Sequence, residues 1–281
     1  MGQHYLPQHY LRHFATPEAP DKIWMYDKCS KEFKRLPIKN VAQSSRFYSE
    51  KDERVLSDWI EGPAQDPLGQ LRNGQEVGVE GRRAVTVYLE SMIKRGPRNR
   101  RKMIEKAPQT KNELLSEIKG NLELEASRFN LSQEELLHKI DEWEGKFDSK
   151  RLSMKDDLIR RQWFSPAVCE YIFSMTWRVI KADDAHRFIT CDHPVFFDEG
   201  YGLKPPYGEF SFPLSSDNAL HGSWRGPQEG FFFVQARPPL VKEIDRRVAF
   251  MAERFVFYHR NASWVPKVAD KLSPRLTPIE W

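Results

Sequence analysis

The first fourteen residues, MGQHYLPQHYLRHF, concentrate side chains that can do chemistry. His4, His9 and His13 lie among them, and an imidazole can act as a general base, a metal ligand or a hydrogen-bonding strut. Gln3 beside His4 can hold one tautomer of the ring, which makes His4 the candidate general base. His9 and His13 have the i, i+4 spacing of the zinc-binding HExxH helix, but Tyr10 stands where that motif has glutamate. The segment therefore favours acid–base chemistry over a zinc site.

A second dense segment, FITCDHPV, occupies residues 188–195. Asp192 follows an apolar run and is held on a rigid turn by Pro194. Its carboxylate can orient a histidine, ligate Mg²⁺ or cap a turn, and the capping role is the most economical. The functional alternative pairs Asp192 with His4, as in the Asp–His dyads that orient an imidazole. His193, next in the chain, is a candidate substrate contact. We expect any site to lie where the two segments meet.

Lysine and arginine crowd residues 94–106, where seven cationic side chains face a single glutamate. Such a stretch attracts phosphates through non-specific electrostatics, and a solvated charged face is an equally weighted alternative. A Gly-Pro pair breaks the helical pattern and presents Arg98 and Arg100 near a helix start. With Arg95, these arginines are the predicted substrate-binding residues, with RNA or DNA as the partner. They would bind phosphate and stabilise negative charge in a transition state.

The chain lacks the sequence motifs that are typical of several enzyme classes. We find no P-loop, no dinucleotide-binding GxGxxG after a strand and no GxSxG hydrolase elbow. The cysteines Cys29, Cys169 and Cys191 are widely spaced and odd in number, which predicts a reducing cytoplasm. We expect no signal peptide and no membrane span, because no apolar run is long enough. The net charge of +4 permits nucleic-acid binding without requiring it.

The elements that must position these side chains predict an α+β fold. Residues 22–27 and 33–41 alternate apolar and polar side chains around a four-residue turn, which predicts an N-terminal β-hairpin. Helical spacing dominates residues 51–72 and 82–95. The C-terminal part then changes to short strands around one helix. We predict strands at 177–181, 187–190, 209–214, 230–235 and 255–259 and the helix at 239–253.

The domain organisation follows from this order of elements. Strands at both ends with helices between them predict a single α+β domain over residues 1–281, its terminal strands in one sheet or in two abutting layers. Capping boxes at Thr110 and Ser132 open two helices of the middle region. We therefore expect a helical-hairpin insertion at residues 108–150. A further helix should start at Ser153 and run to about Met175.

The segment QHYLPQHYLRHF resembles the N-terminal signature of the domain-of-unknown-function family 4238, Gln-His-Tyr-x-Pro-x-x-Tyr-Leu-x-x-Phe. This signature is quite specific, whereas the later matches are individually weak. They follow in chain order at Trp24–Asp27, Arg46–Tyr48, Arg95–Arg100, Phe188–Val195, Phe212–Ser215 and Ala252–Val256. The chain departs from the pattern at Cys191 and His193, where Ser and Asn are expected. The resemblance covers nearly the whole chain.

The resemblance implies a biological setting but no particular reaction. The family is mainly bacterial, and some members look like antiphage defence proteins. Our first hypothesis is a cytoplasmic nuclease or phosphodiesterase used in antiviral defence, with Mg²⁺ as a conceivable cofactor. Its catalytic residues would be His4, Asp192 and Gln3, and its substrate-binding residues Arg98, Arg100, Arg95 and His193. The alternatives are a non-catalytic module that binds nucleic acid or an acidic partner, and a sensor that recognises a phage protein through the insertion. The oligomeric state stays open.

Overall fold

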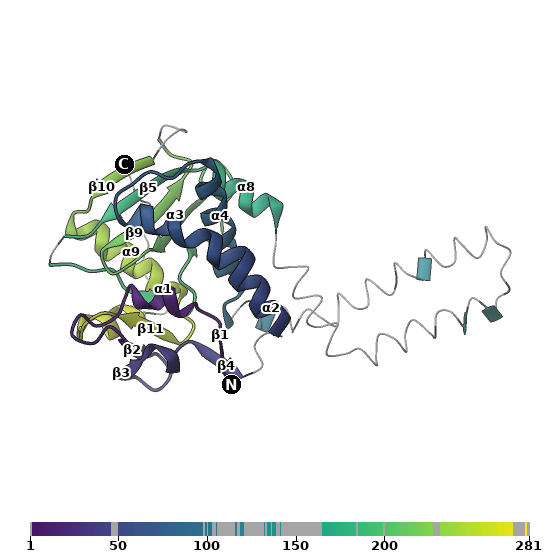
Figure 1. Ribbon diagram of the computed structural model, residues 1–281, viewed down its shortest axis with the longest axis horizontal. Helices are drawn as coiled ribbons and strands as arrows, with labels where there is room; N and C mark the ends of the chain where they lie inside the picture. Colours follow the sequence, from purple (N-terminus) through teal and green to yellow (C-terminus); the bar gives the residue numbers. More distant parts are fainter. Residues whose placement is uncertain are drawn as a thin grey trace. The chain divides into compact units, whose positions relative to one another are not determined.

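The structure is a computed structural model in which the chain forms two compact units, residues 1–98 with 164–281 and residues 99–163. It describes residues 2–45, 50–97, 165–183, 185–198, 200–226, 231–271 and 279, together with scattered positions between 99 and 141. The first unit mixes helices with β-sheets and has an α+β fold, as the sequence predicts (Figure 1).

The described elements of the first unit run in order from β1 to α10. Its helices are α1 (Gln8–Arg12), the 3-10 helix η1 (Ile38–Asn40), α2 (Glu50–Val55), the π-helix η2 (Leu56–Glu61), α3 (Gly62–Arg72), α4 (Val79–Lys94), α8 (Pro166–Ser174), α9 (Pro238–Met251) and α10 (Trp264–Ala269). Its strands are β1 (Gly2–His4), β2 (Lys22–Asp27), β3 (Glu32–Pro37), β4 (Gln43–Ser45), β5 (Thr176–Lys181), β6 (Thr190–Cys191), β7 (Phe196–Phe197), β8 (Glu209–Pro213), β9 (Asn218–Ser223), β10 (Phe231–Gln235) and β11 (Phe255–Tyr258).

The N-terminal hairpin joins the C-terminal strands in one four-stranded sheet. β2 and β3 pair antiparallel, and β2 also pairs with β11, so the sheet order is β3-β2-β11-β6. The pairing places Phe255 opposite Asp27 and Tyr258 opposite Trp24. The predicted hairpin is therefore confirmed, and its partner is a strand more than two hundred residues away in the chain.

A five-stranded sheet of order β10-β5-β9-β8-β7 forms the other half of the first unit. Its β5–β10 pair is parallel, whereas the other pairs are antiparallel. The central strand β9 is buried along its whole length although it contains Gly222 and His221. A Cβ atom on Gly222 would come within 2.0 Å of the Phe210 ring, so glycine allows this close approach.

Helix α9 has the strongest bearing on function because it carries one wall of a pocket. Pro238 and Pro239 begin it, where a missing backbone N–H is tolerated. Its buried stripe includes Val241, Ile244 and Val248, and the helix packs against α10 and strands β6 to β8.

In Figure 1, α1 lies between strands β2, β3 and β11 on one side and β5 and β9 on the other.

Part of the predicted middle region lies outside the described residues. The hairpin insertion at 108–150 and the helix start at Ser153 fall mostly or wholly there, and both stay predictions. The end of the predicted helix is described as α8. No helix in the described part of the chain is both long enough and apolar enough to cross a membrane.

Candidate functional site

The two dense sequence segments meet through Tyr10. Its hydroxyl lies 2.6 Å from Oγ1 of Thr190 on β6 and donates to the carbonyl of Pro213 on β8 at 3.0 Å. The two strands belong to different sheets, so one tyrosine of the N-terminal segment ties both sheets together. Tyr10 is only 2% exposed, and burial raises its pKa well above the ordinary value. The junction is therefore built around a neutral, structural hydroxyl.

The carboxylate of Asp192, at this junction, accepts hydrogen bonds from backbone N–H groups rather than from a histidine. Its Oδ1 accepts the backbone N–H of Glu253 at 2.8 Å, and its Oδ2 accepts those of Arg254 at 2.8 Å and Phe255 at 2.9 Å. The side chain is 1% exposed, and burial raises its pKa to about 6 against the opposing effect of the backbone donors. These contacts fix the turn from α9 into β11, so the structural role of Asp192 is to hold a distant turn rather than to cap its own.

His4 lies on β1, opposite Gln43 of β4, and the hydrogen bonds that Asp192 makes with described residues go to backbone rather than to His4. Burial lowers its pKa, while a hydrogen bond to the backbone of Val41 opposes the shift. Its Nδ1 is buried without a hydrogen-bond partner among the described residues. The His4–Asp192 dyad stays a prediction, and the observed contacts of Asp192 favour its structural alternative.

Arg95 and His193 come together around Gly96. A Cβ atom on Gly96 would lie 2.5 Å from Nδ1 of His193, so the imidazole packs directly on the glycine. Arg95 is 4% exposed and donates from Nη1 to Oε1 of Glu61, at the end of the π-helix, at 2.6 Å. Nδ1 of His9 lies 3.6 Å from the other oxygen of Glu61. The Arg95 guanidinium is thus directed to a carboxylate inside the protein.

The remaining predicted site residues are less informative. Arg98 and Arg100 lie outside the described residues, and the side chain of Gln3 does too. The described residues hold no group of three or more His, Cys, Asp or Glu that could bind a metal ion. Burial and the nearby Arg72 lower the pKa of His13 to about 4. The predicted catalytic and substrate-binding set is therefore brought together only in part.

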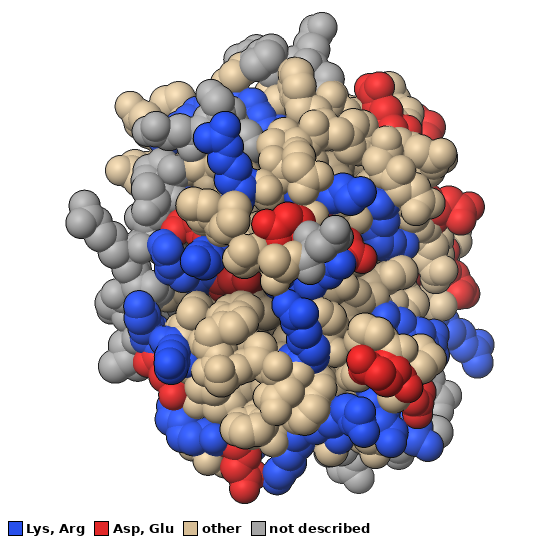
Figure 2. All heavy atoms as spheres, turned by 90° about the vertical axis from the view of Figure 1, so that its left-hand side faces the viewer, with Lys and Arg blue, Asp and Glu red and all other residues tan. Residues whose placement is uncertain are grey.

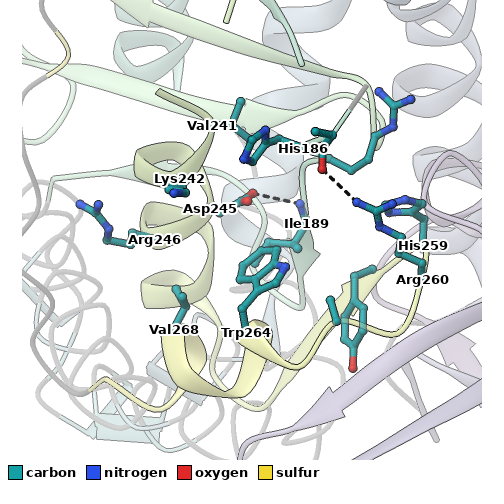
Figure 3. Close-up of a pocket in the computed structure, with 14 residues that line it drawn as sticks. His186, Ile189, Val241, Lys242, Asp245, Arg246, His259, Arg260, Trp264 and Val268 are labelled. Carbon is teal, nitrogen blue, oxygen red and sulfur yellow. Dashed lines mark hydrogen bonds between the residues drawn. The ribbon is translucent and has the colours of Figure 1, made fainter. Parts of the chain in front are cut away.

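A pocket of about 510 Å³ lies elsewhere in the first unit, between α9, α10, the end of β11 and the loop before β6 (Figure 3). Its volume falls in the range of about 300–1,000 Å³ that is typical of small-molecule sites. The lining residues are Ala185, His186, Arg187, Ile189, Val241, Lys242, Asp245, Arg246, Tyr258, His259, Arg260, Ala262, Trp264 and Val268. Lys and Arg supply four of these fourteen, and the walls between them are apolar.

A carboxylate–imidazole pair stands at this pocket. Nδ1 of His186 lies 2.8 Å from Oδ1 and 3.0 Å from Oδ2 of Asp183. The hydrogen bond to His186 is the main reason that the pKa of Asp183 is lowered. Oδ1 also accepts the backbone N–H groups of Ala185 and His186, so the loop holds the carboxylate in place. Both side chains are about one-third exposed, which leaves the pair open to solvent.

Asp245 lies within the apolar stripe of α9. It is 3% exposed, and its Oδ1 accepts the backbone N–H of Ile189 at 3.0 Å. Burial raises the pKa of Asp245 well above its ordinary value, and the backbone donor only partly opposes the shift. Figure 3 shows its carboxyl group between His186 and Trp264. Asp245 thus contributes a buried carboxyl group to the pocket lining.

The rest of the pocket rim is cationic. Lys242 and Arg246 follow Val241 and Asp245 by one residue each, about 100° further around α9. Arg246 donates from Nη1 to Oε2 of Glu243 at 2.5 Å, and Arg187 pairs with Asp217 at 3.0 Å. Lys242 and Arg260 are therefore the rim cations for which the described residues include no carboxylate partner. Arg260 donates to the carbonyl of Ala185 at 3.0 Å (Figure 3).

His259 beside this rim is held neutral, since burial first and then the charges of Arg260 and Arg187 lower its pKa to about 4. On the face drawn in Figure 2, Lys and Arg side chains are spread over the surface with Asp and Glu between them. The molecule offers cations to an anionic ligand at several places, and the pocket combines them with an enclosed volume.

None of the sequence motifs described above belongs to this pocket apart from one residue near the start of the 188–195 segment, although two other signals were present in the sequence. Asp183 and His186 have the i, i+3 spacing that lets neighbouring side chains meet in a turn. Asp245 stands in register with Val241 and Val248 on a helix, where an apolar residue is expected. A carboxylic acid in an apolar stripe indicates a buried polar role.

Comparison with known proteins agrees with the family resemblance. The family model described as Protein of unknown function (DUF4238) matches residues 2–262, which include both motif segments and most of the pocket lining. Neither a curated protein nor a solved structure matches the chain. Because the match spans far more than half of its length, the chain belongs to the DUF4238 family.

Proposed function

We propose that this protein is a phosphodiesterase that acts on nucleic acid or a nucleotide in the pocket between α9, α10 and β11. The observation that carries the proposal is the Asp183–His186 pair at the edge of a pocket with a cationic rim. A histidine oriented by a carboxylate is a common general acid–base arrangement, and cations stabilise the charge that develops on phosphorus oxygens. The proposal keeps the hydrolytic chemistry inferred from the sequence and moves it to different residues.

The reaction needs one proton-transfer group and a charge-stabilising wall. A water molecule attacks phosphorus, and the bond to the leaving oxygen breaks to give a phosphomonoester and an alcohol. His186 takes the proton of the attacking water and returns it to the leaving oxygen, while Asp183 stabilises the imidazolium. Lys242 and Arg260, which both line the pocket, are the candidates for binding the phosphate oxygens. Mg²⁺ remains part of the proposal only as a condition to be tested.

The aromatic lining supports a nucleic-acid ligand over a simple anion. Trp264 is 39% exposed and lies at the pocket, where its indole can stack on a base. Ile189, Val241 and Val268 provide apolar surface beside it. Inorganic phosphate would use none of this surface, whereas a nucleotide would use both the rim and the walls.

A binding module without turnover is the second candidate, and one observation favours it. The Asp183 carboxylate accepts two backbone N–H groups of its own loop, so its contact with His186 can serve loop structure alone. In that case the cationic rim would bind nucleic acid, and His186 would be dispensable. Sensing of a phage protein belongs to this second candidate.

The biological setting is part of the same proposal. Membership of the family supports a bacterial protein, and a nucleic-acid substrate together with three unpaired cysteines supports a cytoplasmic location. Antiviral defence would follow if cleavage of phage or host nucleic acid limits infection. A plaque assay on cells that carry the wild type or His186→Ala measures this directly.

The deciding experiment in vitro is cleavage of single-stranded and duplex RNA and DNA by wild type and His186→Ala, with Mg²⁺ and with EDTA. The exposed His138, in the other unit, gives the matched control His138→Ala. We expect wild type and the control to cleave, and His186→Ala to lose about 10²-fold or more, as for loss of a general acid–base group. Binding without cleavage by wild type would reject the enzyme and favour the binding module. Neither binding nor cleavage would reject both.

A further inference from the structure

The floor of the pocket differs in character from its rim. Asp245 is the one acidic residue among the fourteen that line the pocket, and four of the others are Lys or Arg. Its Oδ1 has one hydrogen bond, from Ile189, and no other hydrogen bond or ion pair of this carboxyl is found in the described part of the chain. The Asp245 carboxyl therefore has hydrogen-bonding capacity that the described residues do not use.

We propose that Asp245 is the base-reading residue of this pocket and selects an aromatic base whose Watson–Crick edge presents an amino group beside an unprotonated ring nitrogen. Adenine and cytosine present this edge. The inference rests on the proposed function, because it specifies which nucleotide the same pocket takes. It adds a specificity determinant to the catalytic and phosphate-binding residues described above.

The position of Asp245 explains the choice of a base over a phosphate at the floor. A phosphate placed at the floor would lose the attraction of the rim cations, and the carboxylic acid form of Asp245 would offer it a single donor. At the rim, the same phosphate meets Lys242 and Arg260. The base then extends inward, where Figure 3 shows Asp245 between the flat side chains of His186 and Trp264. Flat rings on both sides and apolar walls suit an aromatic heterocycle.

The protonation state of Asp245 explains the choice among bases. A buried carboxylate without a cationic partner is costly, and no charge is among the causes that shift this group; burial raises its pKa and the Ile189 N–H only opposes it. The favoured carboxylic acid has one O–H donor and one acceptor oxygen with a remaining lone pair.

That pattern complements the edges of two bases. The acid O–H can donate to N1 of adenine or N3 of cytosine, and the neighbouring amino group can donate back to Oδ1. Guanine and uracil carry an N–H at the corresponding ring position. This N–H and the acid O–H are both donors, so they cannot form a hydrogen bond with each other. A site built to hydrogen-bond a substrate group discriminates strongly against analogues that lack it.

The test is calorimetric binding of AMP, CMP, GMP and UMP to the full chain. We expect AMP and CMP to bind about tenfold more tightly than GMP and UMP, which is the effect of one mispaired buried hydrogen bond. Asp245→Asn supplies the same donor and acceptor as the neutral acid and should keep this preference. Asp245→Leu should abolish it. Purine riboside monophosphate, which lacks the amino group, should bind wild type about tenfold more weakly than AMP.

The outcomes separate this inference from the proposed function. Equal binding of all four nucleotides, weakened by Lys242→Ala, would reject base reading by Asp245 and keep the pocket as a nucleotide site. A preference for GMP that Asp245→Asn removes would show an ionised carboxylate and overturn the inference. Failure of all four nucleotides to bind would overturn the pocket's proposed function as well. If Asp245→Leu does not fold, the comparison of AMP with purine riboside monophosphate still decides the question.

Discussion

Nδ1 of His186 lies 2.8 Å from Oδ1 of Asp183, three residues earlier in the chain. When Nδ1 donates its proton to this carboxylate, Nε2 is the ring nitrogen left to exchange a proton with a ligand. The pair is local in sequence, but it stands at a pocket whose other walls come from residues 241–268. This relationship connects a short loop motif to an enclosed, cationic site.

Asp183→Asn should lower the rate of phosphodiester cleavage by about tenfold or more, because the amide cannot stabilise the imidazolium that forms on His186. Steady-state rates at neutral pH measure this effect, with thermal melts to verify that the variant is folded. A rate within a few fold of wild type would assign Asp183 to loop structure alone, through its bonds to Ala185 and His186.

Lys242→Ala should weaken nucleic-acid binding. It should also reduce the slope of log affinity against log salt concentration by about one, because one fewer counterion is released. Lys242 is exposed at the rim of the pocket, where its ammonium group can reach a phosphate. Lys267→Ala is the matched control, because Lys267 is also exposed but does not line the pocket. Fluorescence titrations of a labelled oligonucleotide at several salt concentrations give the slopes. Equal slopes for the two variants would place the phosphate contact elsewhere.

Asp192→Asn should change the pH dependence of stability in a defined direction. The folded-state pKa of Asp192 is raised to about 6, above its ordinary value of 3.8. The folded protein therefore holds this proton more tightly, so the contribution of Asp192 is fully present below about pH 3.8 and lost as the pH rises through about 6. That contribution to the free energy of unfolding is on the order of 3 kcal/mol.

Urea denaturation at pH 4.5 and pH 7 measures this difference. In Asp192→Asn the contribution should be absent, and the amide should also lower stability at both pH values because it cannot accept all three backbone N–H groups. Asp66→Asn, at an exposed position on α3, should match wild type. An unchanged pH dependence in Asp192→Asn would contradict the burial of this carboxyl.

Gly96→Ala should lower the free energy of unfolding by about 1–3 kcal/mol, because the new methyl group overlaps His193 and the chain must move. The overlap would be with Nδ1 of the ring, at 2.5 Å. Gly69→Ala should have the opposite sign, with a gain of about 0.5–1 kcal/mol, since Gly69 lies inside α3 and a Cβ there meets only an ordinary contact. Thermal melts of both variants test the pair. A stabilised Gly96→Ala would mean that His193 does not pack on this turn.

The sequence predicts the elements well where periodicity is strong. The hairpin at Lys22–Pro37 and the helix α9 carry clear alternation or a clear apolar stripe, and their ends agree with the structure within a few residues. Strand β9 is not predicted, because its residues NALHGS show neither alternation nor β-branched side chains. Its place in the sheet is fixed by contacts with β5 and β8, which no local pattern reveals.

The site is predicted less well than the fold, for a physical reason. The sequence correctly indicates that the N-terminal segment meets residues 188–195, and Tyr10 with Thr190 joins them. It does not reveal that Asp192 and Arg95 direct their charges to internal partners. Whether a polar side chain serves a ligand or the backbone depends on which groups the fold brings within hydrogen-bond reach. The pocket escapes prediction in the same way, since its walls come from four separate segments.

The central claim is that function resides in the α9–α10 pocket rather than at the junction of the two sequence motifs. A side-by-side measurement of nucleic-acid cleavage by His186→Ala and His4→Ala, both verified as folded, tests it most directly. We predict that His186→Ala loses about 10²-fold or more in rate, whereas His4→Ala stays within a few fold of wild type. Loss of cleavage in His4→Ala with full activity in His186→Ala would contradict the claim and return the active site to the N-terminal motif.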